Sequence, residues 1–281
     1  MMAYYNIQDL IKQGEWVLSQ HDESVIGAKY LMMDLFDLSH MDILIGEQTL
    51  TEDERSLYLS GITQLSKHIP LAHLTGFQMF YDRKFIVTPD VLVPRNETEE
   101  LVQLVIEKWH HRTSFVDIGT GSGAIAVSLA IELSEVDAYA VDISKKALLV
   151  ARKNAVSLNA NVTFLEGDLL KPLIDNKIKV DCLVSNPPYI AASELKLMNE
   201  SALHDPHIAL FAEDNGLALY KRMLDDLVHI LNPNALVVFE IGHAQGEAIK
   251  QYVAQLYPHI TPKIVQDING LDRIVWFEWC E

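Results

Sequence analysis

Hydrophobic positions change their spacing along the chain, and the change separates a first part, residues 1–75, from the rest. In this part apolar residues recur every three or four positions, which predicts helices at 6–18 and 25–35 and a third helix closed by Pro70. The third helix opens with Thr51-Glu52-Asp53-Glu54, a capping-box pattern. We therefore expect residues 1–75 to form a small all-helical domain, in which we find no chemical motif.

Residues 76–95 differ from this helical part. Apolar runs at 77–80 and 85–87 flank the polar stretch Tyr81-Asp82-Arg83-Lys84, a pattern that predicts a β-hairpin. We interpret the hairpin as a linker between two domains. The alternative, that its strands belong to a larger sheet, remains open on the pattern alone.

From residue 96 to residue 281, strand-like and helix-like patterns alternate. Asn96 is a candidate N-cap with Glu99 at the capping-box position, and the helix that follows should extend to Trp109. Beyond it, apolar runs alternate with helical stretches, which predicts an α/β fold with a doubly wound, mainly parallel sheet. The predicted strands lie near 114–118, 137–142, 162–166, 180–185, 235–241 and 273–279, and the predicted helices near 122–133, 145–157, 216–231 and 244–256.

The stretch Asn186-Pro187-Pro188-Tyr189 directly follows the predicted strand at 180–185. Proline has no N–H and pushes the residue before it out of the α region. We therefore expect a stiff loop whose backbone carbonyl acceptors have no N–H donors beside them. Such a loop suits a planar –NH2 group: the side-chain oxygen of Asn186 and the carbonyl oxygen of Pro187 would each accept one N–H. The ring of Tyr189 would lie against the flat face of that group. The alternative is an ordinary turn, because Asn-Pro is a common turn signal.

A second motif, Gly119-Thr120-Gly121-Ser122-Gly123, connects the predicted strand at 114–118 to a helix. Glycines allow positive φ angles and a close approach of the backbone to a ligand. Gly119, Gly121 and Ala124 also match the dinucleotide-binding fingerprint. The loop alone therefore does not separate a nicotinamide cofactor from S-adenosylmethionine.

Two aspartates stand at the ends of the next two predicted strands. Asp142 has the spacing of an acidic residue that binds ribose hydroxyls, and Asp168 could contact an adenine amino group. Taken alone, each aspartate would favour helix capping or loop solvation. Because the carboxyl ends of parallel strands meet at one edge of a sheet, we expect both to lie near the glycine loop and near Asn186.

Composition excludes few functions but weighs against some. The net charge is −17, and both parts of the chain are acidic, so no basic footprint for nucleic acid is visible. We expect no disulfide between Cys182 and Cys280, a cytoplasmic location and no membrane segment. We expect no metal site either, because the adjacent residues His110 and His111 would diverge on a helix.

Together the Asp117–Gly123 and Asn186–Tyr189 motifs resemble those of class I S-adenosylmethionine-dependent methyltransferases that act on planar nitrogens. More narrowly, the chain resembles the protein-(glutamine-N5) methyltransferases of peptide-chain release factors, which have a Rossmann-like sheet, a helical amino-terminal domain and a hairpin. The resemblance extends over nearly the whole chain. It includes Pro94–Glu99, Asp205-Pro206, Ala209–Phe211, Asn215–Leu217, Glu240–Gly242 and Gly270–Arg273.

This resemblance implies methyl transfer from S-adenosylmethionine to the glutamine side chain in the Gly-Gly-Gln loop of class I release factors. It implies cofactor contacts by Gly119–Gly123, Asp142, Leu169 and Asn186, and glutamine binding by Asn186–Tyr189. We accordingly expect a monomer in which residues 1–75 dock the protein substrate, residues 76–95 form the linker, and residues 96–281 carry the chemistry. We expect no direct binding of nucleic acid.

The chain departs from the family pattern at four places around the expected acceptor entrance. Asn96 stands where the family has proline, Asp205 where it has glutamate, Ala212-Glu213 where it has Gly-Gly, and Asn215 where it has aspartate. The departures leave fine substrate preference open.

Three other functions remain to be weighed. A nucleic-acid amino methyltransferase, acting on adenine N6 or ribosomal-RNA guanine, could use the same loop, but the charge of −17 counts against it. A nicotinamide oxidoreductase would leave Asn186–Tyr189 unexplained. An inactive cofactor-binding scaffold would have no need of an intact Asn186–Tyr189 loop, which we call the acceptor loop because it would bind the methyl acceptor.

Overall fold

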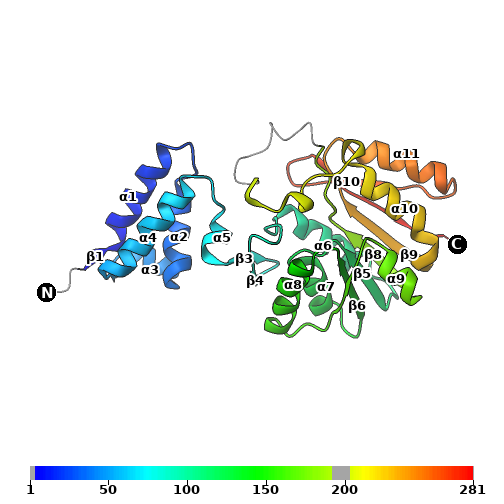
Figure 1. The fold of residues 1–281 in the computed structure, drawn as a ribbon, viewed down its shortest axis with the longest axis horizontal. Helices are drawn as coiled ribbons and strands as arrows, with labels where there is room; N and C mark the ends of the chain where they lie inside the picture. Colours follow the sequence, from blue (N-terminus) through cyan, green and yellow to red (C-terminus); the bar gives the residue numbers. More distant parts are fainter. Residues whose placement is uncertain (1–3, 192–202, 281) are drawn as a thin grey trace. The chain divides into compact units, whose positions relative to one another are not determined.

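The computed structural model describes residues 4–191 and 203–280 (Figure 1). The chain divides into two compact units. Unit 1 comprises Met1–Phe77 and Asn199–His204, and unit 2 comprises Gln78–Met198 and Asp205–Glu281.

Unit 1 is built from short helices around an apolar core that includes Ile7, Leu31 and Tyr58. The predicted capping box is present: the Thr51 hydroxyl accepts from the Glu54 N–H, and the Glu54 carboxylate accepts from the Thr51 N–H. A short strand pair was not predicted. The elements are β1 (Tyr5–Asn6), α1 (Ile7–Ser19), α2 (Ile26–Phe36), α3 (His40–Ile45), β2 (Thr49–Leu50), α4 (Glu52–Leu65) and α5 (Leu71–Thr75).

The prediction that the third helix extends to Pro70 was wrong. The helix α4 ends at Leu65, and the chain turns through His68, which has a positive φ of 63°. Pro70 instead occupies the N-cap of α5. A proline can stand at a helix start because the N–H that it lacks would have no intrahelical partner there.

The predicted hairpin is present as a two-stranded sheet of β3 (Phe77–Phe80) and β4 (Arg83–Ile86), separate from the large sheet. Its turn residues Tyr81 and Asp82 both have positive φ angles, as a tight two-residue hairpin turn requires. Phe80 and Phe85 pack edge to face, with ring centroids 5.9 Å apart, and join the core of unit 2.

The large sheet of unit 2 has seven strands in the order β10-β11-β9-β8-β5-β6-β7. The strands β5 to β9 run parallel, and β11 pairs antiparallel with both β9 and β10. This confirms the predicted doubly wound, mainly parallel sheet; only the short edge strand β10 was missed. The strands are β5 (Ser114–Ile118), β6 (Asp137–Asp142), β7 (Thr163–Glu166), β8 (Val180–Ser185), β9 (Leu231–Glu240), β10 (Lys263–Gln266) and β11 (Asp272–Glu278).

Helices cover both faces of this sheet (Figure 1). Alternate strand residues serve the two layers: Phe115 and Cys182 pack with α6, α7 and α8, whereas Val116 and Leu183 pack with α9, α10 and α11. A sheet buried on both faces requires near-continuous apolar strands, which is why the strand patterns were so clear. The helices are α6 (Glu97–Glu107), α7 (Ala124–Glu132), α8 (Lys145–Ser157), α9 (Lys171–Asn176), α10 (Ala218–Ile230) and α11 (Gly246–Leu256).

The expected capping box at the start of α6 was wrong. Asn96 has helical angles, and its side chain makes no capping hydrogen bond. The Glu99 carboxylate instead accepts from the backbone N–H of Tyr81, 2.9 Å away in the hairpin turn. The Glu99 carboxylate thus bonds to the hairpin turn and does not make the helix cap that the local pattern had predicted.

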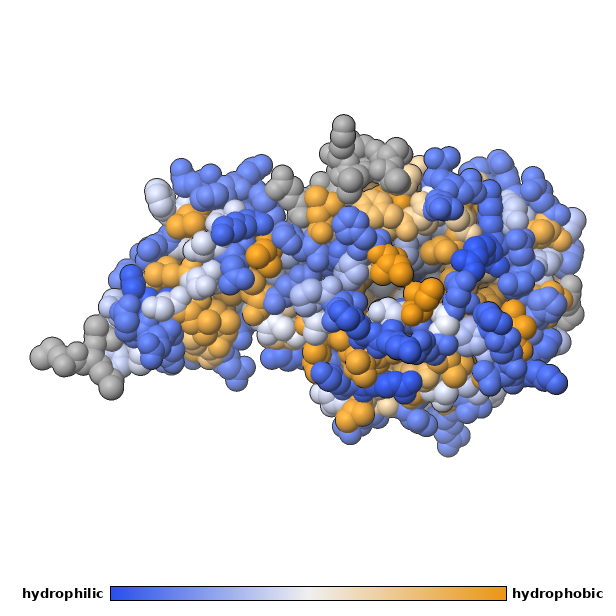
Figure 2. Space-filling view, in the orientation of Figure 1, coloured by the Kyte–Doolittle hydropathy of each residue, from blue (hydrophilic) through white to orange (hydrophobic). Residues whose placement is uncertain are grey.

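Both cysteines are free, with Cys182 buried and Cys280 exposed. Among the described residues, no helix combines the length and the apolar character needed to cross a bilayer. Figure 2 shows hydrophilic residues over much of the visible face, with a hollowed area of unit 2 that has apolar residues beside it.

Candidate active site

A pocket of about 230 Å³ lies at the carboxyl ends of β5, β6, β7 and β8, where the strand order reverses. This is the place at which open α/β sheets bind ligands. Besides the strand ends, the loop before α6, the stretch after residue 205 and helix α10 contribute to its walls. The predicted residues that line it are Gly119, Gly121, Asp142, Asp168, Leu169, Asn186 and Pro188. Five other predicted residues do not line it: Thr120, Ser122, Gly123, Pro187 and Tyr189.

The glycine loop leaves open space beside the pocket. Gly119 and Gly121 have φ angles of 74° and 54°, and a Cβ at either position would meet no atom within 4 Å. The conformation, rather than crowding, therefore requires these two glycines, and the space above them is available to a ligand. Gly123 has two reasons, because its φ is 82° and its Cβ would also lie 3.1 Å from Ala151.

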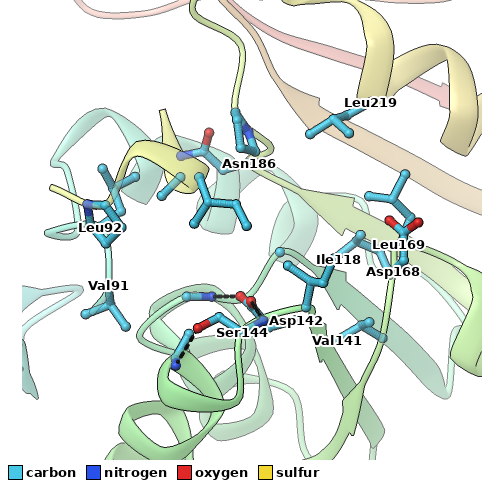
Figure 3. A pocket seen from close by; sticks show the side chains of 18 of the residues that line it. Val91, Leu92, Ile118, Val141, Asp142, Ser144, Asp168, Leu169, Asn186 and Leu219 are labelled. Carbon is cyan, nitrogen blue, oxygen red and sulfur yellow. Dashed lines mark hydrogen bonds between the residues drawn. The ribbon is translucent and has the colours of Figure 1, made fainter. Parts of the chain in front are cut away.

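Asp142 holds the glycine loop in place while facing the pocket (Figure 3). Its Oδ2 accepts from the Gly121 N–H and its Oδ1 from the Ser144 N–H, each at 2.8 Å. Burial raises the pKa of this carboxyl. Each carboxylate oxygen keeps a further lone pair, so Asp142 can fix the loop and still accept hydroxyl groups of a ligand.

A second carboxyl group, which was not predicted as part of the site, lies beneath the loop. Asp117 is fully buried at the end of β5, and its Oδ2 accepts from the Thr120 hydroxyl at 2.6 Å. Burial raises the pKa of Asp117 to about 7, partly offset by this hydrogen bond. Thr120 therefore supports the loop from below rather than lining the pocket.

Asp168 and Leu169 form the wall beyond β7. The Asp168 carboxylate pairs with the guanidinium of Arg222 from α10, a partner that was not predicted. Leu169 has a φ of 48°, which is unusual for a residue with a branched side chain. Its side chain lines the pocket.

The loop after β8 presents Asn186 to the pocket, across from Asp142 in Figure 3. Nδ2 of Asn186 donates to the hydroxyl of Thr98, 3.2 Å away on the first turn of α6. That hydroxyl donates in turn to Oε2 of Glu240 at 2.7 Å. The polar wall behind Asn186 thus comes from segments far away in the sequence.

The backbone around Tyr189 is held by groups that were not predicted. Its carbonyl oxygen accepts from Nε2 of Gln245 at 2.8 Å, and a Cβ on Gly216 would lie only 2.0 Å from the same oxygen. The Tyr189 ring packs against the core cluster on the α10 side of the sheet. Burial, followed by the charge of Glu240, raises the pKa of the Tyr189 phenol to about 12.

Asp205 ties together two segments that border the pocket. Its buried carboxylate accepts from Arg95 at 2.6 Å and from the Val93 N–H at 3.3 Å. The chain around Val93 reaches the pocket through Leu92, and the chain after Asp205 reaches it through Pro206. The departure noted at residue 205, aspartate in place of a longer glutamate, falls on this tie.

Family models match both units. The model described as PrmC N-terminal domain matches residues 9–76, and the methyltransferase small domain matches residues 96–205. Release factor glutamine methyltransferase of Staphylococcus aureus is 38% identical, with 90% of this chain and 91% of the relative covered. The Bacillus subtilis protein of the same name is 41% identical, with 82% of each covered.

The chain belongs to the release factor glutamine methyltransferase family. This confirms the family that the motifs indicated and the expected class of enzyme, a methyltransferase. A methyltransferase of Pyrococcus furiosus shares the fold at a TM-score of 0.53 and 16% identity, with 82% of this chain and 99% of that chain covered.

Proposed function

We propose that the chain transfers a methyl group from S-adenosylmethionine to the side-chain amide nitrogen of the glutamine in the Gly-Gly-Gln loop of class I release factors. One observation carries the proposal. Asn186 lines the pocket, and its amide nitrogen donates to the buried Thr98 hydroxyl, which leaves the amide oxygen as an acceptor. An acceptor at this place suits a substrate –NH2 group, and family membership supports the same reaction.

The residues of the pocket fit S-adenosylmethionine. The open space above Gly119 and Gly121 admits a ligand close to the backbone, and Asp142 can accept ribose hydroxyls. Leu169 and Val141 supply apolar surface for a purine, with Asp168 beside them for an amino group. When bound, S-adenosylmethionine supplies an electrophilic methyl group on a sulfonium sulfur.

The task of the acceptor loop is to orient a poor nucleophile. The lone pair of an amide nitrogen is delocalised, so positioning and stabilisation of developing charge must provide most of the rate increase. Oδ1 of Asn186 and the carbonyl oxygen of Pro187 would accept the two N–H bonds of the glutamine amide. The peptide bonds before Pro187 and Pro188 are trans, and the two proline rings restrict the φ angles of this loop.

We further propose that residues 1–75 help to dock the release factor, while residues 96–281 carry the chemistry and residues 76–95 join them. Unit 1 exposes large apolar side chains on α3: Met41, Leu44 and Ile45 are 60%, 78% and 59% exposed. Such a face offers contact area to a protein partner. The net charge of −17 favours a protein substrate over nucleic acid and suits a basic partner. We expect the chain to act as a monomer in the cytoplasm.

A methylation assay with four acceptors tests the proposal. The full chain is incubated with radiolabelled S-adenosylmethionine and, in parallel, an intact release factor, a short Gly-Gly-Gln peptide, duplex DNA or ribosomal RNA. We expect strong label on the release factor and weak label on the peptide, which lacks the remote contacts that help to position the amide. Label on nucleic acid alone would favour a nucleic-acid methyltransferase, and label on none would favour an inactive scaffold.

A further inference from the structure

Three polar side chains from separate elements form a hydrogen-bonded chain that leads from the pocket, at Asn186, to the buried residues Thr98 and Glu240. Thr98 lies on the first turn of α6, Glu240 at the end of β9, and Asn186 after β8. Thr98 is 5% exposed and Glu240 is 2% exposed. The Thr98 hydroxyl donates to Glu240 at 2.7 Å and accepts from Nδ2 of Asn186 at 3.2 Å.

The chemistry of these groups fixes the direction of the hydrogen bonds. A carboxylate has no proton to donate, so the Thr98 hydroxyl must donate its single hydrogen bond to Glu240. The hydroxyl oxygen is then only an acceptor toward Asn186, and an acceptor can pair with the amide nitrogen but not with the amide oxygen. A hydrogen bond from Asn186 also helps to lower the pKa of Glu240, which is the behaviour of a donor.

We propose that Thr98 and Glu240 are positioning residues that hold the Asn186 amide in the one orientation able to bind a substrate –NH2 group. The inference rests on the proposed function, because it specifies how that same site recognises an amide donor. With the nitrogen of Asn186 held by the wall, its oxygen is left for the glutamine. If the Asn186 side-chain amide rotated so that its nitrogen and oxygen exchanged places, its own NH2 would face the substrate NH2, and two donors cannot form a hydrogen bond.

The ionisation of Glu240 connects this orientation to pH. Burial raises the pKa of Glu240 to about 7, although Thr98, Arg273 and Asn186 act to lower it. A protonated Glu240 no longer requires the Thr98 proton, so the hydroxyl becomes free to donate to the oxygen of Asn186. The titratable and charged groups around Glu240 are Arg273 from β11, Glu97 from α6, Tyr189 from the acceptor loop and Tyr220 from α10, whose hydroxyl donates to the Glu240 backbone oxygen.

A purely structural role makes different predictions. In that case the Thr98–Glu240 bond would only fasten α6 to β9, and its loss would lower the melting temperature without changing turnover of the folded enzyme. A positioning role predicts a loss of kcat with little change in cofactor affinity, rescue by any side chain that keeps the hydroxyl, and an altered pH profile.

The test uses the full chain with an intact release factor and compares Thr98→Val, Thr98→Ser and Glu240→Gln. Thr113→Val is the matched control, because Thr113 also donates to a carboxylate, that of Asp181, 3.0 Å away. We expect Thr98→Val and Glu240→Gln to lower kcat roughly tenfold or more, the scale for a misplaced reacting group. Thr98→Ser should keep most of the activity and Thr113→Val all of it. Titration with S-adenosylhomocysteine should give similar affinities throughout.

The pH profile provides the second readout. Because the Thr98 hydroxyl passes the ionisation of Glu240 on to Asn186, Thr98→Val and Glu240→Gln should both remove the acidic limb of kcat. Wild-type kcat in folded Thr98→Val and Glu240→Gln would overturn the inference, as would equal losses in Thr98→Ser and Thr98→Val. If Thr98→Val fails to fold, an acidic limb that persists in Glu240→Gln is the overturning result. Failure of the unsubstituted chain to methylate the release factor would instead overturn the proposed function itself.

Discussion

The two units of the chain bury different kinds of residues. The core of unit 1 is apolar among the residues described there, and its buried Tyr58 hydroxyl bonds to the Ala28 carbonyl oxygen at 3.1 Å. The charged residues buried in the described part of the chain all belong to unit 2: Asp117, Asp205, Glu240 and Asp267.

This contrast bears on where we propose the chemistry to lie. A buried carboxylate costs free energy unless hydrogen bonds compensate for its lost hydration, so such groups stabilise a fold poorly. In unit 2 three of them, Asp117, Asp205 and Glu240, support the walls of the pocket. Unit 1 buries none among its described residues and instead exposes apolar side chains on α3. The comparison agrees with our proposals that unit 2 carries the chemistry and that unit 1 helps to dock the substrate.

The largest effect should come from removing the amide acceptor in unit 2. Asn186→Ala should lower kcat by about 100- to 1,000-fold, the range for loss of one preorganised hydrogen bond to a reacting group. The affinity for S-adenosylhomocysteine, measured by calorimetric titration, should change much less. An equal loss of affinity and turnover would mean that Asn186 serves the cofactor and not the glutamine.

Asp117→Asn should change the pH dependence of stability. The pKa of Asp117 is about 7 in the folded chain and near 4 when unfolded, so the stability contributed by its neutral form is complete below pH 4 and lost as the pH rises through 7. Asparagine cannot ionise but can still accept from Thr120. The variant should therefore match the wild type at pH 4 and exceed it by a few kcal/mol at pH 8 in denaturant unfolding.

The matched control for this prediction is Tyr58→Phe in unit 1. Burial raises the pKa of Tyr58 far above this pH range, so the change in its unfolding free energy should be the same at pH 4 and pH 8. A constant difference between Asp117→Asn and the wild type over the same range would show that Asp117 does not titrate as described.

Substitutions of Tyr189 test whether its ring or its hydroxyl serves the acceptor amide. Tyr189→Phe should keep most of the turnover, whereas Tyr189→Ala should lose roughly tenfold, since the aromatic surface is then missing. Steady-state kinetics with an intact release factor provide the measurement. Similar losses in both variants would assign the role to the hydroxyl instead.

The smallest effect concerns the docking face of unit 1. Leu44→Asp should raise the KM for an intact release factor about fivefold, which corresponds to about 1 kcal/mol of lost apolar contact. Val156→Asp on α8 is the control, because Val156 is also 78% exposed but belongs to unit 2. A KM that rises equally in both variants, or in neither, would count against docking through this face.

Local signals explain what the sequence could predict. The bounds of β5, β6 and β8 were predicted to the residue because a strand buried on both faces is a continuous apolar run. The glycine loop and Asn186–Tyr189 were found because each is a compact motif. Thr98 and Glu240 were missed, since 142 residues separate them. The available signal was a single carboxylate inside the apolar run 235–241.

The most direct test of the central claim is tandem mass spectrometry of an intact release factor after incubation with the full chain and S-adenosylmethionine. The account predicts one added methyl group on the side-chain nitrogen of the Gly-Gly-Gln glutamine. It also predicts that the modification is nearly absent at the same incubation time with Asn186→Ala. A methyl group on any other residue, or an unchanged yield with Asn186→Ala, would contradict the account.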